Sequence, residues 1–473
     1  MSEFTLIIHG WSDCSSSFVA LKKQLQKNGI GDVDTILYGD YQSREDNITF
    51  NDVVDGLNDQ MKEKGLIEPD GKKVADLNIV VHSTGGLVIR HWIWHYYSHR
   101  MEECPVKRIL MLAPANFGSP LAHRGKSFLG RLVKGRWKVG DLLEVGRKLL
   151  DGLELASPYQ WQLAHHDIFN GNSSYYNRDQ IQLTILTGIE DYSGLRGWVN
   201  KPGTDGTIVI SGAPLNSVKL KLNFSNVDMP YEWKEMKTAD DFCFGVLPDL
   251  DHGSIVSSFE DDNAQIIKIA VNALKINSAE EFGEFKIQLK QKTDETYQNY
   301  STKDAKRFSK YQQFLIHGLD DHGEPVRDFT FEFEVYKTEK ASEQTVSNQS
   351  YFNNLEKHYS DQFQKLLLSQ IHTHIKDASY RRLLVNLHEM DLLMEETRDQ
   401  LGEFVLIMKI YIPEIDKGIF YDVDSLQNIV IYRSDEKESA QKVPSLFYEN
   451  TTTLLEFSVD RKTKYVRIGE EPA

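Results

Sequence analysis

A serine in a glycine-rich corner is the first residue of this chain whose surroundings indicate chemistry. Ser83 follows the mostly apolar run 77–81 and precedes residues 85–97, whose types are those of a buried helix. A strand that turns sharply into a helix, with serine at the corner, is the geometry of a nucleophile elbow. The turn needs a small residue two positions after the serine, and Gly85 supplies it. Because a bare serine-x-glycine match usually marks only a turn, the prediction depends on partners for Ser83.

Two residues further along the chain have the types needed to activate this serine. A serine hydroxyl is a weak nucleophile until a base takes its proton, and histidine does so best when a carboxylate fixes its tautomer. Asp205 lies in a Thr-Asp-Gly-Thr turn, and His252 lies in an Asp-His-Gly-Ser loop. Each alone is more often a simple loop residue, but the order serine, aspartate, histidine is that of α/β hydrolases. We therefore predict Ser83 as nucleophile, Asp205 as the orienting acid and His252 as the base.

The negative charge that forms on attack needs two backbone N–H donors. We predict that the backbone amide of Thr84, which follows the nucleophile, is one donor. The amide of Trp11, in the loop after the first strand, is predicted to be the other. Gly10, His82 and Gly85 are expected to support these turns. We expect no cofactor and no metal for this chemistry. The acidic pair Asp320-Asp321 is compatible with calcium but is more typical of a solvated turn.

The elements that must position these residues alternate regularly over residues 1–276. Residues 4–8, 33–38, 77–81 and 108–113 read as strands with helices between them, which predicts an α/β fold with a mostly parallel sheet covered on both faces. The alternation breaks for about sixty residues after the fourth strand, a length at which a functional lid is expected. We predict a cap insertion over about 119–176.

The chain changes character near residues 276–281, where we predict a domain boundary. Beyond it, short alternating runs such as 285–289, 329–335 and 404–412 read as strands, and residues 351–395 read as one helical region. Residues 281–473 are therefore expected to form a β-rich accessory domain, of the α+β or β-sandwich-like class, with a helical insertion.

The charge of the chain bears on its partners. A formal net charge of −16 argues against nucleic acid as a partner. Residues 123–150 nevertheless carry eight basic against two acidic residues, a local charge of +6 that leaves −22 on the remainder. Such a basic, apolar cap suits peripheral contact with an anionic membrane surface; solvated charges on an ordinary cap are an equal alternative.

Other features bear on location. The chain has no apolar run long enough for a membrane span, no signal-like N-terminus and only three cysteines. We expect free thiols and a cytoplasmic protein, or one exported without a cleaved signal. The oligomeric state is left open.

With these motifs in place, residues 1–276 resemble bacterial lipases and esterases, including phospholipase-like members, of the α/β-hydrolase superfamily. The resemblance rests on His9-Gly10, the elbow 82–86, the loop 113–120, Thr204-Asp205-Gly206 and Asp251-His252-Gly253. It implies hydrolysis of carboxylic esters of lipids through an acyl-enzyme intermediate. Val81 departs from the pattern, which has glycine or alanine two residues before the serine. A thioesterase or acyltransferase uses the same triad, and a non-catalytic binding protein on a hydrolase core is a further alternative.

Overall fold

In the computed structural model the chain forms two compact units. The structure describes residues 3–8, 15–36, 47–122, 147–170, 174–192, 200–224, 234–237, 241–338, 353–413, 419–426, 428–435 and 446–462. The first unit comprises Met1–Ser217, Thr238–Lys310 and Asn450–Thr452, and the second comprises Val218–Lys237, Tyr311–Glu449 and Thr453–Ala473. The boundary predicted near 276–281 therefore lies at the start of a helix, α9 (Ala279–Ser301), that belongs to the first unit.

The first unit is built on a six-stranded sheet in the order β2-β1-β3-β4-β5-β8. Every neighbouring pair in it is parallel, which confirms the predicted α/β class. Parallel strands buried on both faces are expected to carry continuous apolar runs, and β3 and β4 do so at Ile79–Val81 and Ile109–Leu112. The strands are β1 (Glu3–Ile8), β2 (Val33–Ile36), β3 (Asp76–His82), β4 (Val106–Leu112), β5 (Gln182–Gly188) and β8 (Cys243–Leu247).

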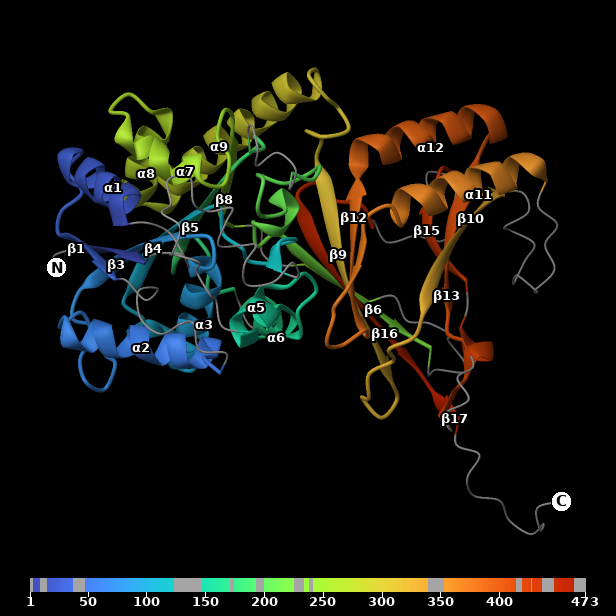
Figure 1. The fold of residues 1–473 in the computed structure, drawn as a ribbon, viewed down its shortest axis with the longest axis horizontal. Helices are drawn as coiled ribbons and strands as arrows, with labels where there is room; N and C mark the ends of the chain where they lie inside the picture. Colours follow the sequence, from blue (N-terminus) through green and yellow to red (C-terminus); the bar gives the residue numbers. More distant parts are fainter. Residues whose placement is uncertain are drawn as a thin grey trace, which may run out of the picture. The chain divides into compact units, whose positions relative to one another are not determined.

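Helices cover both faces of this sheet (Figure 1). On one face lie α2 and α3, and on the other lie α1 and α8. The α2 helix starts at a capping box in which Thr49 and Asp52 satisfy each other's backbone amides, and α3 is apolar on nearly every side because it is buried. The helices are α1 (Ser15–Lys27), α2 (Phe50–Glu63), α3 (Gly85–Tyr97), α7 (Ser254–Ser257), α8 (Gln265–Lys275) and α9 (Ala279–Ser301).

The region predicted as a cap is described only in part. Residues 147–170 form α5 (Arg147–Leu153) and α6 (Pro158–Asp167), which pack against each other, and α6 packs against α3. Ser157 caps α6 through a bond to the amide of Tyr159, and Pro158 occupies the first turn. Most of the basic stretch, residues 123–146, lies outside the described residues.

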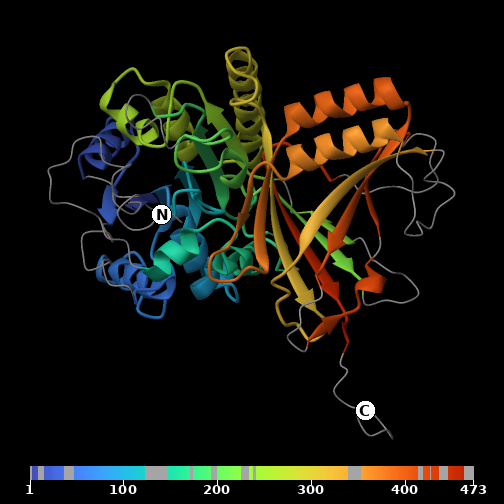
Figure 2. The same cartoon turned by 45° about the vertical axis from the view of Figure 1, so that its right-hand side comes forward.

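The second unit contains two main sheets that share one apolar core. One has the order β11-β12-β9-β16-β6-β7, and the other is the antiparallel sheet β10-β13-β15. Two helices, α11 (Asn354–Leu367) and α12 (Leu387–Leu401), lie side by side in Figures 1 and 2. The strands are β6 (Ser217–Asn223), β7 (Lys234–Lys237), β9 (Tyr311–Asp320), β10 (Thr330–Lys337), β11 (Ile371–Thr373), β12 (Tyr380–Asn386), β13 (Phe404–Tyr411), β14 (Phe420–Tyr421), β15 (Ile429–Arg433), β16 (Thr451–Val459) and β17 (Arg461–Lys462), of which β14 and β17 pair with each other.

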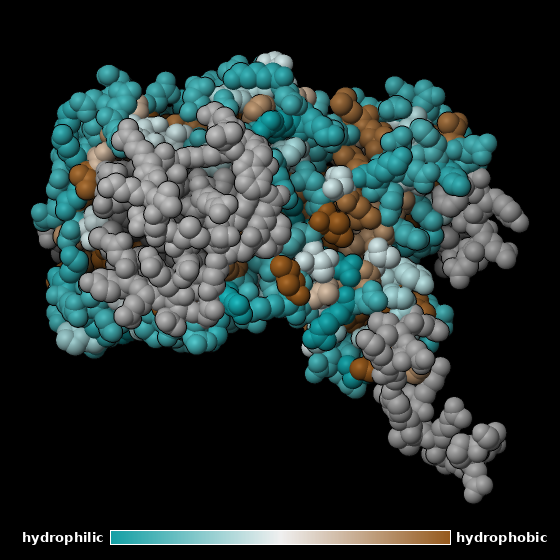
Figure 3. Space-filling view, in the orientation of Figure 1, coloured by the Kyte–Doolittle hydropathy of each residue, from teal (hydrophilic) through white to brown (hydrophobic). Residues whose placement is uncertain are grey.

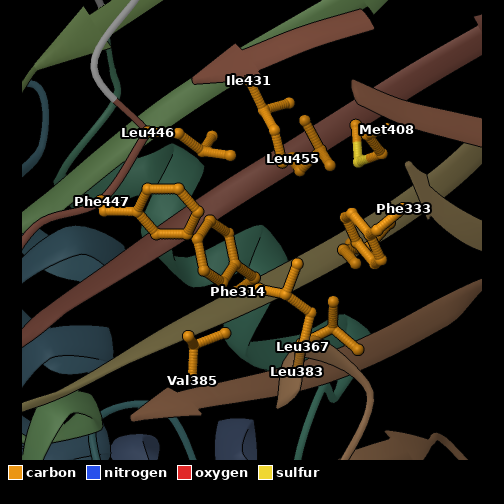
Figure 4. Close-up of a pocket in the computed structure, with 11 residues that line it drawn as sticks. Phe314, Phe333, Leu367, Leu383, Val385, Met408, Ile431, Leu446, Phe447 and Leu455 are labelled. Atoms are coloured by element: carbon orange, nitrogen blue, oxygen red, sulfur yellow. The ribbon is translucent and has the colours of Figure 1, made fainter. Parts of the chain in front are cut away.

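Inside this unit, apolar side chains from both sheets surround a small pocket (Figure 4). Phe314 and Val385 contribute from one sheet, and Phe333 and Met408 from the other. No polar side chain is among its lining residues, so the pocket is part of the apolar interior of this unit.

Helix α11 covers the outer edge of β10 with polar side chains. The carboxylate of Glu356 accepts from the amide of Lys337 at 3.1 Å, and the hydroxyl of Ser360 accepts from that of Val335 at 2.9 Å. Gln364 accepts from the amide of Phe333 at 2.8 Å and donates to the carbonyl of Phe331 at 3.1 Å. Three backbone amides and one carbonyl of β10 thus find partners on α11, within the same unit.

Two predictions about the C-terminal part are wrong. Residues 285–289 lie in α9, where Phe282, Phe285 and Leu289 recur at helical spacing and are buried; a five-residue window is too short to show that period. The helical region 351–395 is also interrupted, because β11 and β12 separate α11 from α12.

In the structure, Asp320 accepts from the amides of His322 and Glu324 and pairs with Arg461, so its carboxylate stabilises a turn.

The surface of the first unit is mostly hydrophilic where it is described and in view in Figure 3. Among the helices of the described ranges, none is long and apolar enough to cross a membrane.

Candidate active site

Ser83 occupies the sharp turn between β3 and α3, as predicted for a nucleophile elbow. Its φ is +54°, a conformation that costs a non-glycine residue on the order of 1–2 kcal/mol. Three backbone bonds hold this turn: Ser83 donates to the carbonyl of Leu112 at 3.1 Å, and the amides of Gly86 and Ala115 donate to the Ser83 carbonyl at 3.2 and 3.0 Å. The strain is therefore compensated by the backbone around it.

Two glycines make room for this turn. A Cβ atom on Gly85 would lie 3.0 Å from the Cβ of Val81, and one on Gly86 would lie 2.7 Å from the Cβ of Pro114. Val81 is completely buried. The bulk that departs from the usual pattern at Val81 is thus accommodated, since the residue opposite it has no side chain.

The structure brings Ser83, Asp205 and His252 together, although they are far apart in the chain. The Nε2 atom of His252 lies 3.1 Å from the Oγ of Ser83, and its Nδ1 lies 3.0 Å from the Oδ2 of Asp205. The side chains of Asp205 and His252 are 0% and 1% exposed, so this contact is shielded from water. A neutral imidazole that donates through Nδ1 to a carboxylate has Nε2 available to accept the serine proton.

The carboxylate of Asp205 is held by its own turn. Its Oδ1 accepts from the amides of Thr207 and Ile208 at 3.0 and 2.8 Å. The other oxygen, Oδ2, is thereby directed to His252. The carboxylate is thus held in the orientation in which it can align the imidazole of His252.

The loop that carries His252 is fixed at several points after β8. The amide of His252 donates to the carbonyl of Asp205 at 2.9 Å. Asp251 accepts from the amides of Gly253 and Ser254 at 2.9 and 2.7 Å, which closes a tight turn next to the histidine. Gly188 at the end of β5 allows this loop to come close, because a Cβ there would lie 1.9 Å from the carbonyl oxygen of Leu250.

The loop after β4 connects the nucleophile turn to the acid turn. Asn116 donates to the carbonyl of Ala213 at 2.7 Å, and the hydroxyl of Ser119 donates to the carbonyl of Thr207 at 2.6 Å. Together with the bond from the Ala115 amide to the Ser83 carbonyl, these contacts connect the turn of Ser83, the loop after β4 and the turn of Asp205.

The buried ion pair next to this loop was not predicted from the sequence. Arg90 on α3 binds Asp167 at the end of α6, and both side chains are completely buried. A signal was available, because Arg90 is the one residue of Lys, Arg, Asp or Glu type within residues 85–97. Nothing near Asp167 in the sequence indicated that it was the partner.

The predicted donors to the oxyanion differ in how far the structure describes them. Thr84 is the N-cap of α3, where backbone amides have no partner within the helix, and its position directly after Ser83 suits a donor. Trp11 and Gly10 lie outside the described residues. Gly85 and His82 flank the turn as predicted, and His82 also contacts the loop of His252.

Within the described ranges, no group of three or more His, Cys, Asp or Glu side chains is arranged to hold a metal ion. The free thiols of Cys104 and Cys243 are buried, and burial raises the pKa of each to about 12. These thiols are therefore protonated and unreactive at neutral pH.

The fold is similar to that of a phospholipase of known structure. No family model matches the chain, and no curated protein matches it in sequence. The structure is similar to that of phospholipase PlaB from Legionella pneumophila, with 19% identity, a TM-score of 0.74 and coverage of 100% of this chain and 97% of that one. A second structure of phospholipase PlaB from Legionella pneumophila, in complex with thio-NAD, gives 21% identity and a TM-score of 0.73 with the same coverage. The chain therefore has the α/β-hydrolase fold with a C-terminal β-rich unit, as predicted.

Proposed function

We propose that this protein is a serine hydrolase that cleaves carboxylic esters of lipids through an acyl-enzyme intermediate. The observation that carries the proposal is the buried chain of hydrogen bonds from Asp205 through His252 to Ser83. A binding protein on a disabled hydrolase core has no need to keep this geometry together with a strained serine turn.

In the first half of the reaction, the Oγ of Ser83 attacks the ester carbonyl while Nε2 of His252 takes the hydroxyl proton. The resulting imidazolium is stabilised by Asp205. The amide of Thr84 donates to the oxyanion, and the second donor is proposed to be the amide of Trp11. When the tetrahedral intermediate collapses, the C–O bond to the alcohol breaks, and His252 returns the proton to the departing alkoxide.

In the second half, water replaces the alcohol. His252 takes one proton from the water as it attacks the acyl-enzyme carbonyl, and the second tetrahedral intermediate releases the acid. The proton returns from His252 to the Oγ of Ser83, which restores the resting enzyme. In both halves of the reaction, Nε2 of His252 first takes a proton and then gives it back. This atom therefore has to lie within hydrogen-bond distance of the Oγ of Ser83, as it does.

Lipid esters, including phospholipids, are the proposed substrate class. Support comes from the likeness in fold to a phospholipase over the whole chain and from the basic, apolar composition of residues 123–150. We also propose that these residues contact anionic membrane surfaces, where each basic side chain contributes about 1 kcal/mol.

A fluorophosphonate probe tests the chemistry. The parent chain is expected to be labelled on Ser83, and the Ser83→Ala variant is expected to stay unlabelled at equal protein concentration. Absence of labelling on the parent chain would favour the non-catalytic alternative.

A substrate panel then tests the class. Phospholipids, triglycerides, soluble short-chain esters and acyl thioesters are compared at matched acyl length, and lipid esters are expected to give the highest kcat/KM. Higher kcat/KM on thioesters would indicate a thioesterase. Liposomes of anionic phospholipid should bind the parent chain and raise its activity above that on soluble esters; liposomes that do neither would refute the membrane proposal.

A further inference from the structure

His82, the residue before the proposed nucleophile, makes a hydrogen bond across the active site. Its Nε2 lies 3.0 Å from the backbone carbonyl oxygen of His252. A carbonyl oxygen only accepts, so Nε2 of His82 carries the hydrogen and donates it. The side chain is 1% exposed, and burial away from water makes such a bond stronger and its loss more costly.

With this bond, His252 is held by three hydrogen bonds: one from its amide, one at its ring and one to its carbonyl. The amide of His252 donates to the carbonyl of Asp205, its Nδ1 bonds the carboxylate of the same residue, and its carbonyl accepts from His82. The peptide groups on both sides of the His252 Cα are thus fixed. Rotation about χ1 and χ2 is then restricted by the bond to Asp205.

The partner on the other side is next to the reacting atom. His82 is covalently joined to Ser83, whose Oγ is 3.1 Å from Nε2 of His252. Any drift of the His252 loop away from the elbow would therefore have to break the bond to His82. The imidazole rings of the two histidines are 4.8 Å apart between centroids, so they also pack against each other.

We infer that His82 is a positioning residue, which sets the distance between Ser83 and His252 by donating Nε2–H to the carbonyl of His252. This inference rests on the proposed function. It assigns His82 no proton transfer and no contact with substrate. Its effect comes from alignment, because displacement of a reacting group by about 1 Å costs about 100-fold in rate.

Three substitutions separate this hydrogen bond from bulk packing. His82→Gln places an amide N–H near the position of Nε2 and keeps the bond. His82→Asn places its amide near Nδ1, too short to reach the carbonyl, and His82→Leu keeps volume without a donor. The Asn and Leu variants are expected to lose about 10- to 100-fold in kcat on a short-chain ester with KM changed less than about twofold, and Gln is expected to restore most of the rate.

The rate constant of fluorophosphonate labelling on Ser83 is measured in parallel, with circular dichroism to confirm folding. If the parent chain is not labelled, the proposed function fails. The role of His82 is refuted if the parent is labelled and the Asn and Leu variants are labelled at the same rate. It is also refuted if the folded Gln variant is labelled as slowly as the Leu variant.

Discussion

The guanidinium of Arg90 and the carboxylate of Asp167 face each other in two parallel hydrogen bonds, from Nε at 2.7 Å and from Nη2 at 2.9 Å. Both side chains are completely buried, the remaining nitrogen donates to the carbonyl of Asn116 at 3.1 Å, and the hydroxyl of Tyr176 donates to Asp167 at 3.1 Å. Burial opposes the charge on Arg90, but the charge and hydrogen bonds of Asp167 outweigh it and raise the pKa of Arg90. The pair therefore joins α3, which starts at the elbow, to α6.

Removal of one partner of this pair should destabilise the protein strongly. Arg90→Met leaves the carboxylate of Asp167 buried without its cation, and the free energy of unfolding is expected to fall by about 3–5 kcal/mol. Urea unfolding followed by circular dichroism measures the change. Lys27→Met is the matched control: Lys27 pairs with Asp262 at the surface, where both side chains are more than half exposed, and a loss of about 1 kcal/mol or less is expected. Equal losses in the two variants would contradict the structural role of Arg90.

Asp205→Asn should abolish most activity without unfolding the active site. The asparagine oxygen still accepts from the amides of Thr207 and Ile208, so its NH2 group faces Nδ1 of His252. Nδ1 then has to accept, and the hydrogen moves to Nε2, which can no longer take the serine proton. A loss of about 10⁴-fold in kcat is expected.

The measurement is ester hydrolysis at substrate saturation. Asp262→Asn serves as the control, since this exposed carboxylate pairs with Lys27 at the surface, and its kcat should equal that of the parent. Retention of parental activity by Asp205→Asn would exclude it as the orienting acid.

Gly188→Ala should displace the loop of His252. Its Cβ would lie 1.9 Å from the carbonyl oxygen of Leu250, so the backbone of that loop has to move. We expect slower labelling of Ser83 by fluorophosphonate, together with a loss of stability in thermal unfolding. Gly56→Ala in α2 is the opposite case, because nothing lies within 4 Å of its added Cβ, and it should stabilise the helix by about 0.5–1 kcal/mol. An active, stable Gly188→Ala variant would show that the loop is not confined there.

The buried His91 should make stability depend on pH in the acid range. Burial, together with the nearby His95 and His166, lowers its pKa from 6.5 to about 4, although Asp55 acts in the opposite direction. Between pH 6.5 and 4 the unfolded chain therefore binds a proton on His91 that the folded chain does not bind. The stability that comes from the neutral His91 is fully present above pH 6.5 and is lost as pH falls towards 4. The loss from this group is at most on the order of 3 kcal/mol.

Urea unfolding between pH 7 and 4 measures this dependence. His91→Asn keeps a polar group near Nδ1, which lies 3.0 Å from the hydroxyl of Tyr159, and should flatten the pH dependence. His99 is exposed, and the control variant His99→Asn should keep the pH dependence of the parent. Parallel curves for the parent and His91→Asn would rule out His91 as the cause.

The residues of the candidate site could be proposed from the sequence because each of them carries a local signal. Ser83 sits in a strand-turn-helix pattern with Gly85, and Asp205 and His252 sit in turns in the expected order. How Val81 is accommodated could not be predicted in the same way, since the space for its side chain comes from the tertiary position of Gly85. The bond from His82 to His252 spans 170 positions and has no local signature.

The second unit shows a different limit. Residues 285–289 fit a strand when seen alone, and only the recurrence of buried residues through Tyr300 reveals α9. Strand pairing across residues 218–459 joins segments that no short pattern connects, such as β6 and β16 in one sheet. The fold class of this unit was predictable from alternation, whereas its strand order was not.

The polar ladder between α11 and β10 also limits how chains of this protein can associate. Four residues of helix advance about 6 Å, and two residues of strand advance about 6.6 Å. Every fourth residue of α11 can therefore bond every second residue of β10, and the pairs are Glu356 with Lys337, Ser360 with Val335 and Gln364 with Phe333. A foreign strand that tried to extend the sheet at β10 would first have to displace the helix. This border is therefore protected against edge-to-edge aggregation.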